Sequence, residues 1–247
     1  MKRLAGVAVV AVTLSALSAG TVSAHKGAPG LTVKENRALV KADGPGFRVK
    51  LTKHDLRVRI DDKRFGIPEA GFPIERSQTD LGPFAPSIQP FECEHGSYQV
   101  VSGIFDVTER ASSTEPRPLP YTPAFAERFP TILTFVGTLD AVVTNEDGER
   151  FRLLMSDLAH EVMKPHSFAS TAPIHAFIVD SSGRVRDRAS LTGRVNIDRT
   201  TGEAVHKIVD RGTCHQRANL DLGPGTDQAV VFGPFFVLPF NTTVVVR

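Results

Sequence analysis

The sequence predicts an all-β protein, and two observations carry this prediction. Apolar and polar residues alternate in short stretches along most of the chain, and turns rich in Gly, Pro, Asn or Asp separate these stretches. A period of two residues is typical of strands that bury one face. The chain has no convincing helical pattern longer than two turns and no fixed-period repeat. Roughly ten to twelve short strands of this kind indicate a barrel or a sandwich.

The expected strands follow one another in a meander. The clearest hairpin joins residues 131–143 to residues 151–155 through the turn Asn145–Gly148, where Gly148 suits a positive φ. A meander with exposed edges tends to close, so we expect a closed antiparallel barrel, with a two-sheet sandwich as the alternative. The stretches with strand-like alternation are 47–51, 56–60, 98–109, 131–143, 151–155, 174–180, 191–197, 204–208, 212–222, 228–232 and 235–246.

Two segments rich in proline interrupt the meander. Residues 65–93 and 111–130 contain many prolines, which remove backbone donors and fix φ, so we expect long loops rather than strands. The first segment also contains four phenylalanines. We therefore expect residues 65–93 to cap one end of the barrel, either as a simple cover or as one wall of an apolar pocket.

The N-terminus has the pattern of a secretory signal peptide. Lys2 and Arg3 precede an apolar run, and Val22-Ser23-Ala24 provides a small-x-small cleavage pattern. We expect residues 1–24 to be removed, residues 25–46 to form a flexible lead-in, and residues 47–247 to form a single β domain. The protein is then secreted and does not insert in a membrane after cleavage.

The charge balance limits the classes of partner. The chain has 29 Lys+Arg and 27 Asp+Glu, and the two basic residues of the leader account for the difference. A neutral mature chain argues against nucleic acid and against electrostatic membrane binding, because both need an excess of Lys and Arg.

The two cysteines, Cys93 and Cys214, predict one disulfide bond. An even number of cysteines in an exported chain favours pairing. In the chain-entropy model, a bond that closes so long a loop contributes on the order of 4–5 kcal/mol. Nothing in the sequence resembles a redox Cys-x-x-Cys motif, so we interpret the pair as a structural staple.

The densest group of candidate catalytic residues follows the hairpin. If Met155 points inward, strict alternation also points Asp157 and Glu161 inward, and paired carboxylates are a common arrangement for acid–base chemistry. A β-bulge near Leu153 would instead turn His160 inward. His175 lies in the next strand. Asp157, Glu161, His160 and His175 are therefore the candidate catalytic residues, although a strand that runs past the barrel rim would leave them in solvent.

A metal site is a weaker alternative. His160, His166 and His175 would supply three ligands for a divalent cation such as zinc if the chain reverses between them, but their spacing matches no known metal motif. We expect no cofactor.

Sixteen phenylalanines and the absence of tryptophan favour an apolar ligand over a glycan. We therefore expect a secreted barrel that binds an apolar small molecule in a Phe-lined interior. One alternative is an enzyme on the same barrel, such as a cyclase, isomerase or hydrolase. A second alternative is an interaction protein of the cell envelope that has no pocket and displays a large exposed apolar patch.

Overall fold

The structure is a computed structural model that describes part of the chain. The described residues are 30–66, 73–88, 90–111, 132–164, 167–198, 204–214, 218–220, 229–232, 236–238 and 242–246. The expected leader, residues 1–24, lies outside them.

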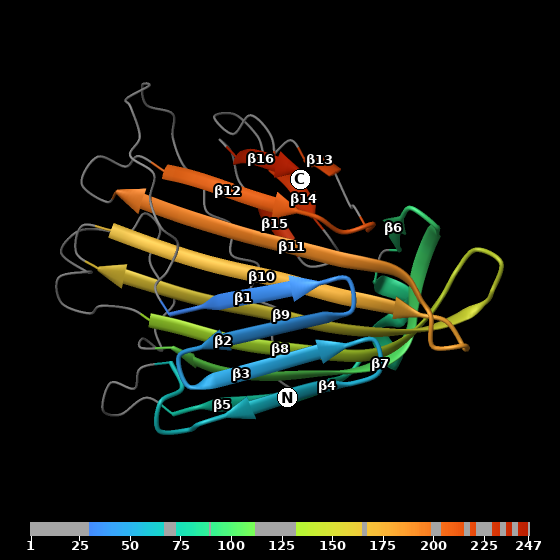
Figure 1. Cartoon of the computed structure of the whole chain (residues 1–247), viewed down its shortest axis with the longest axis horizontal. Helices are drawn as coiled ribbons and strands as arrows, with labels where there is room; N and C mark the ends of the chain where they lie inside the picture. Colours follow the sequence, from blue (N-terminus) through green and yellow to red (C-terminus); the bar gives the residue numbers. More distant parts are fainter. Residues whose placement is uncertain are drawn as a thin grey trace, which may run out of the picture.

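The described residues are all-β, as predicted, and the strands form three sheets (Figure 1). A small four-stranded sheet has the order β1-β2-β3-β4 and is antiparallel throughout. Its strands are β1 (Thr32–Asn36), β2 (Leu39–Gly44), β3 (Phe47–Thr52) and β4 (Leu56–Ile60).

The large sheet has the order β16-β12-β11-β10-β9-β8-β7-β5, with β6 also paired to β7. Its pairs are antiparallel except β12 and β16, which are parallel. Its strands are β5 (Glu75–Asp80), β6 (Phe91–Cys93), β7 (Gly96–Ala111), β8 (Ile132–Thr144), β9 (Arg150–Lys164), β10 (Ser167–Val179), β11 (Val185–Asp198), β12 (Ala204–Asp210) and β16 (Thr242–Val246).

Two smaller pieces complete the described structure. A short 3-10 helix, η1 (Gly82–Ser87), follows β5, and a three-stranded sheet has the order β13-β14-β15. The strands of this third sheet are β13 (Ala218–Leu220), β14 (Ala229–Phe232) and β15 (Phe236–Leu238).

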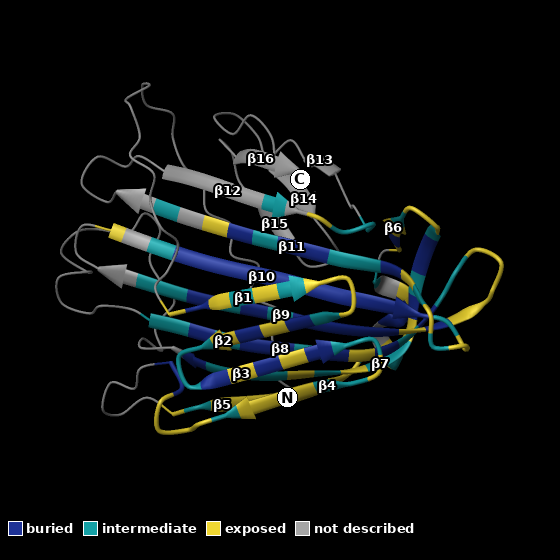
Figure 2. Cartoon of the chain, in the orientation of Figure 1, coloured by how far each residue is buried: buried dark blue, intermediate teal, exposed yellow. Residues whose placement is uncertain are grey.

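The small sheet packs on one face of the large sheet, and we call the apolar residues between them the inter-sheet core (Figures 1 and 2). Strict alternation on β3 turns Phe47, Val49 and Leu51 toward the large sheet and leaves the residues between them exposed. The members of this core come from both sheets and from the 61–66 turn: Leu31, Val40, Ala42, Phe47, Val49, Leu51, Phe65, Val136, Leu154, Leu158, Phe177 and Val179.

The opposite face of the large sheet, which we call the far face, carries a second apolar cluster. Leu139 on β8 and Met155 on β9 lie directly opposite each other in this cluster. The cluster comprises Phe91, Tyr98, Val100, Leu139, Ala141, Val143, Phe151, Leu153, Met155, Ile174, Ala176, Ile178 and Leu191. Strand β9 therefore buries residues on both faces.

The predicted hairpin of β8 and β9 is confirmed, and its turn contains Gly148 at φ 78°. The register runs without a shift from Thr144 opposite Arg150 to Ile132 opposite Val162. The bulge considered near Leu153 is therefore absent, and strict alternation continues through the part of β9 that carries the candidate residues.

Three differences from the sequence-based expectations concern the segment before the small sheet, the segment before β7 and the closure of the barrel. Two strands, β1 and β2, lie within residues 25–46, where we expected a flexible lead-in. Strands β6 and β5 both lie within residues 65–93, where we expected only loop, and β5 pairs with β7 as the edge strand of the large sheet. Its sequence is entirely polar and exposed, so it has no apolar periodicity by which it could be recognised. The residues that the structure describes form no closed barrel.

Within the described ranges, no helix is long and apolar enough to cross a membrane.

Candidate functional site

The structure separates the four candidate catalytic residues into two pairs. Asp157 and Glu161 lie on the far face of β9, in phase with Met155. His160 alternates with them and faces the small sheet, and His175 on β10 faces the same way, in phase with Phe177. The large sheet itself therefore lies between the two carboxylates and the two histidines.

The two histidines also lie apart from each other. His160 pairs with Thr171 on β10, and His175 is four residues farther along the same strand. At about 3.3 Å per residue, this offset corresponds to about 13 Å, too far for two ligands of one metal ion. His166 lies outside the described residues.

The one group in the described part of the chain with metal-ligand spacing consists of Cys93, Asp187 and Cys214. Its two sulfur atoms form the predicted disulfide bond, so they are not available as thiolate ligands.

Asp157 lies in an environment that disfavours its charged form. The side chain is half-buried on the far face, where its directly opposite neighbours are Gly137 on β8 and Ile174 on β10. Neither neighbour offers a polar side chain. Removal from water raises the pKa of Asp157 to about 7. A carboxyl group with such a pKa can give or take a proton near neutral pH.

His160 is fully buried in the inter-sheet core. Its Nδ1 lies 2.9 Å from the hydroxyl of Thr134, its cross-strand neighbour on β8. These contacts fix the imidazole inside the protein, out of reach of a substrate.

His175 contributes to a groove at the edge of the small sheet. Strand β1 is the edge strand there, and the groove lies between it and strands β10–β12 of the large sheet. The volume is about 260 Å³. Three of the lining residues are apolar (Leu31, Val33, Val209), and the others are polar (Glu35, Thr171, His175, Ser190, Thr192, Arg194, Arg211).

Glu35 is the carboxylate at the centre of this groove. Nε2 of His175 lies 3.1 Å from its Oε2, and the hydroxyl of Ser190 donates to the same oxygen. The other oxygen, Oε1, lies 3.5 Å from Nη1 of Arg211. His175 is opposite Ser190 in the sheet register, so β10 and β11 present both partners to β1 side by side.

These contacts stabilise the charged form of Glu35. The hydrogen bond with His175 is the largest influence and lowers its pKa to about 2, while burial opposes this effect and Ser190 and Arg211 add to it. Because the folded-state pKa lies below the ordinary value of 4.5, this contribution to stability is present above that value and is lost as the pH falls toward 2.

Below the groove, two buried polar atoms have no hydrogen-bond partner among the described residues. They are Nδ1 of His175 and the hydroxyl of Ser156, which lies directly opposite His175 on β9. A buried hydroxyl without a partner costs about 1–3 kcal/mol. We therefore expect Ser156→Ala to leave the free energy of unfolding unchanged or to raise it by about 1 kcal/mol, as measured by urea denaturation. A loss of about 1 kcal/mol or more would instead show that the hydroxyl is paired in solution.

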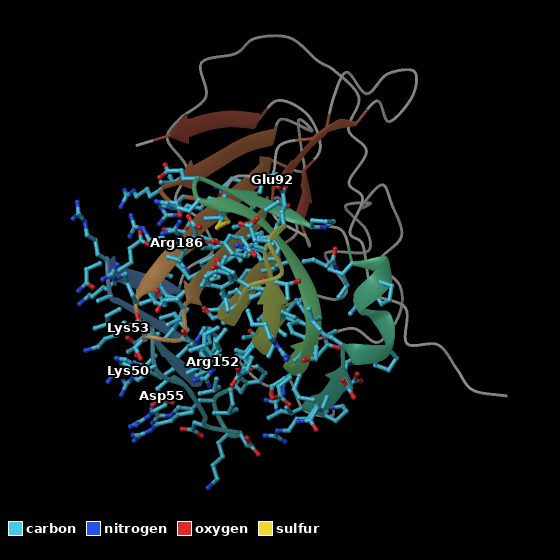
Figure 3. All side chains as sticks on the ribbon, turned by 90° about the vertical axis from the view of Figure 1, so that its right-hand side faces the viewer. Lys50, Lys53, Asp55, Glu92, Arg152 and Arg186 are labelled. Atoms are coloured by element: carbon cyan, nitrogen blue, oxygen red, sulfur yellow. A yellow bond between two sulfur atoms is a disulfide. The ribbon has the colours of Figure 1, made fainter. Side chains whose placement is uncertain are left out.

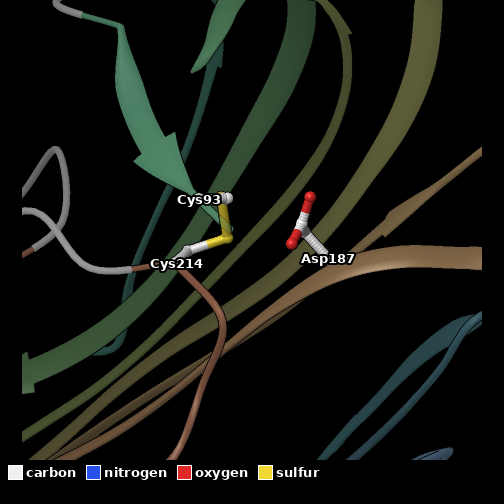
Figure 4. A group of neighbouring side chains, drawn as sticks. All are labelled: Cys93, Asp187 and Cys214. Carbon is white, nitrogen blue, oxygen red and sulfur yellow. A yellow bond between two sulfur atoms is a disulfide. The ribbon is translucent and has the colours of Figure 1, made fainter. Parts of the chain in front are cut away.

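A second polar cluster is centred on Asp187, whose side chain lies beside the disulfide bond of Cys93 and Cys214 (Figure 4). The fully buried carboxylate of Asp187 accepts hydrogen bonds from Tyr98 at 2.7 Å and from Thr213 at 2.8 Å, and Nδ1 of His95 lies 2.9 Å away. Burial, followed by the bond to Asp187, raises the pKa of Tyr98. All of these groups satisfy one another, which identifies the cluster as a structural junction between β6, β7 and β11.

Comparison with known proteins gives no match: no protein-family model, no curated protein and no solved structure is significantly similar to this chain.

The sequence-based candidates include His175 but none of its partners in the groove. Glu35 lies 155 residues before Ser190, in a stretch that the pattern indicated to be a lead-in. No feature of the sequence distinguishes Arg194 and Arg211 from the other arginines of the chain. The available signal was the alternation of Val33 and Glu35 between exposed polar residues, which marks a strand with one inward carboxylate.

Proposed function

We propose that this protein is exported and binds a small organic anion in the groove between β1 and β10–β12. The observation that carries the proposal is the position of Arg194. Arg194 lines the groove, and no described carboxylate forms an ion pair with it. Glu35 already has its partners in His175, Ser190 and Arg211. The groove therefore presents a cation that a ligand carboxylate can match.

The apolar lining residues limit the rest of the ligand. Leu31, Val33 and Val209 line the groove together with its polar residues, so a molecule with an apolar body and one carboxylate can contact both kinds of side chain. The volume of about 260 Å³ lies slightly below the range of typical ligand pockets, which favours a small molecule.

This proposal keeps small-molecule binding and changes the expected polarity of the ligand. Five phenylalanines, Phe47, Phe65, Phe91, Phe151 and Phe177, pack in the two apolar clusters, as in the edge-to-face pair of Phe47 and Phe65. Support for a purely apolar ligand in a Phe-lined interior is correspondingly weaker than support for an anion beside Arg194.

We also propose the two-sheet sandwich, rather than the closed barrel, as the fold class. The inter-sheet core supports it, because Phe47 and Val49 of the small sheet contribute to the same cluster as Val136 and Leu158 of the large sheet. Secretion is supported by the leader-like N-terminus and by the disulfide bond.

The test compares a carboxylate with its neutral analogue. We expect hexanoate to bind the mature protein and hexanamide to bind at least about tenfold more weakly, because only the carboxylate pairs with Arg194. Arg194→Ala should weaken hexanoate binding by about tenfold, which corresponds to about 1.4 kcal/mol. Titrations followed by NMR chemical shifts of the groove residues measure both quantities.

Arg184→Ala is the matched control, because Arg184 is an exposed arginine in the turn between β10 and β11. It should bind hexanoate as the unmodified protein does. Equal affinity for hexanoate and hexanamide, or equal losses in the two variants, would contradict the proposal.

One observation favours an enzyme as a second candidate. The raised pKa of Asp157 suits a general acid or base, and its partly exposed position on the far face is compatible with contact to a substrate. In this candidate Asp157 acts without His160 and His175, which lie on the other side of the sheet. Turnover of a substrate that persists unchanged in Asp157→Asn would exclude this role.

A further inference from the structure

The outer face of the small sheet carries a straight row of cations. The register places Lys34 opposite Lys41, Lys41 opposite Lys50, and Lys50 opposite Arg57. All four side chains are exposed. Because neighbouring strands lie about 4.8 Å apart, the row crosses the sheet over about 14 Å. Figure 3 shows Lys50 projecting outward from this sheet.

This arrangement is unfavourable for the isolated sheet. Like charges that lie directly opposite each other on neighbouring strands repel, whereas opposite charges attract. Two carboxylates are present on the same face: Asp43 pairs with Arg48 beside the row, and Asp55 pairs with Arg57 at one end of it. No described carboxylate forms an ion pair with Lys34, Lys41 or Lys50. Because the row of cations costs stability, the binding of an anionic partner explains its presence better than a stabilising role does.

The net charge of the whole chain does not reveal the local excess of positive charge on this face. The outer face of β1–β4 carries six cations and two carboxylates, whereas the chain as a whole is close to neutral. The members of this set are Lys34, Lys41, Arg48, Lys50, Arg57 and Arg59 with Asp43 and Asp55.

The linear arrangement of the positively charged side chains favours a linear partner over a membrane. The unmatched lysines form one line, with the ion pair of Arg48 and Asp43 on one side of it. The outward positions of β1–β4 also contain no aromatic residue that would anchor the face in a lipid interface. A polymer with repeating negative charges can lie along such a line and meet each cation in turn.

We propose that the outer face of the small sheet binds a linear phosphate-bearing polymer, which lies across the strands along Lys34, Lys41, Lys50 and Arg57. Lysine suits phosphate because its ammonium is a compact charge that needs no fixed bidentate geometry. This surface is separate from the groove, because its side chains point away from the large sheet. It adds a second binding function to the small-molecule site.

The test uses inorganic polyphosphate as the probe, with the mature protein and its disulfide intact. We expect long-chain polyphosphate to bind more tightly than monophosphate, because only a chain can reach all four cations. The affinity should fall with salt, with a log–log slope of about −3 for four contacts to a single strand. The double variant Lys41→Glu/Lys50→Glu should bind at least about tenfold more weakly and with a shallower salt slope.

The control variant Arg150→Glu/Arg186→Glu makes the same change in net charge at exposed positions of β9 and β11. It should bind polyphosphate within about twofold of the unmodified protein, so equal losses in the two double variants would overturn the proposal. Absence of polyphosphate binding would also overturn it, as would tighter binding to phosphatidylglycerol vesicles, which would identify a membrane surface as the occupant.

Thermal unfolding separates a loss of binding from a loss of structure. The double variant replaces three like-charge contacts in the row by two opposite-charge contacts, with Lys34 and with Arg57, and one contact between the two new carboxylates, so it should melt no lower than the unmodified protein. If the double variant does not fold, Lys41→Gln/Lys50→Gln removes the two charges without reversing them, and the same tenfold comparison applies.

Discussion

Asp187→Ala is expected to lower the free energy of unfolding by about 3–5 kcal/mol. The carboxylate is fully buried and accepts hydrogen bonds from Tyr98 and Thr213, and it lies within hydrogen-bond distance of His95. Its removal leaves the buried hydroxyl of Tyr98 without its partner, which adds a desolvation cost to the lost bonds. Urea unfolding with the disulfide bond kept oxidised measures the effect.

Two further variants test this explanation. Asp187→Asn keeps the shape and one acceptor oxygen, so it should cost less than Asp187→Ala. In a Tyr98→Phe background no orphaned hydroxyl remains, and Asp187→Ala should then cost about 1–3 kcal/mol less than in the unmodified protein. Equal costs in both backgrounds would show that the bond from Tyr98 to Asp187 contributes nothing.

The junction around Asp187 also explains the position of the disulfide bond. Cys214 lies next to Thr213, whose hydroxyl donates to Asp187 and whose backbone N–H donates to the carbonyl of Arg188 on β11. Cys93 ends β6, which pairs with β7. The bond therefore joins two segments 121 residues apart at the place where a buried carboxylate already fixes their side chains.

The alternation of single residues was sufficient to predict the strands but not the layers. The run from Leu133 to Val143 and the turn at Gly148 predicted the hairpin of β8 and β9 with its correct phase. The pattern then becomes ambiguous, since Leu153 and Leu154 are both apolar. The physical reason is that the small sheet covers one face of β9 and the far-face cluster lies on the other, so β9 is buried on both faces like a strand in a parallel sheet.

The candidate site could be predicted only in part for a related reason. Alternation correctly assigned His175 to a buried phase, in line with Phe177. The groove, however, is completed by Glu35 and Arg211, which come from segments 176 residues apart in the sequence. The packing of the two sheets determines which edge of the small sheet lies over which strand of the large sheet. No local pattern encodes it, whereas the cation row follows directly once the register of β1–β4 is known.

The second large effect concerns Asp157 and depends on pH. We expect Asp157→Asn to raise the free energy of unfolding by about 3 kcal/mol at pH 8. Burial raises the folded-state pKa of Asp157 to about 7, whereas the unfolded chain has its ordinary value of 3.8. A shift of this size corresponds to about 4 kcal/mol, and partial exposure to solvent reduces it.

The sign of the effect follows from proton binding. Between pH 3.8 and about 7 the folded state retains a proton that the unfolded state has lost, so the stability of the unmodified protein falls as the pH rises through this window. Above about pH 7 the cost of burying the charged carboxylate is constant, and below pH 3.8 the carboxyl group is protonated in both states. The gain in Asp157→Asn should therefore be full at pH 8 and vanish near pH 4, which urea unfolding over this range measures.

The matched control for this pH profile is Asp147→Asn, in the exposed turn between β8 and β9. A surface substitution of this kind changes stability by less than about 0.5 kcal/mol, and here it should do so at every pH. A gain in Asp157→Asn that does not vary with pH would show that the carboxyl group is hydrated in the folded protein. Since a hydrated carboxylate has no reason to hold its proton at pH 7, that result would also remove the one observation that favours Asp157 as an acid–base catalyst.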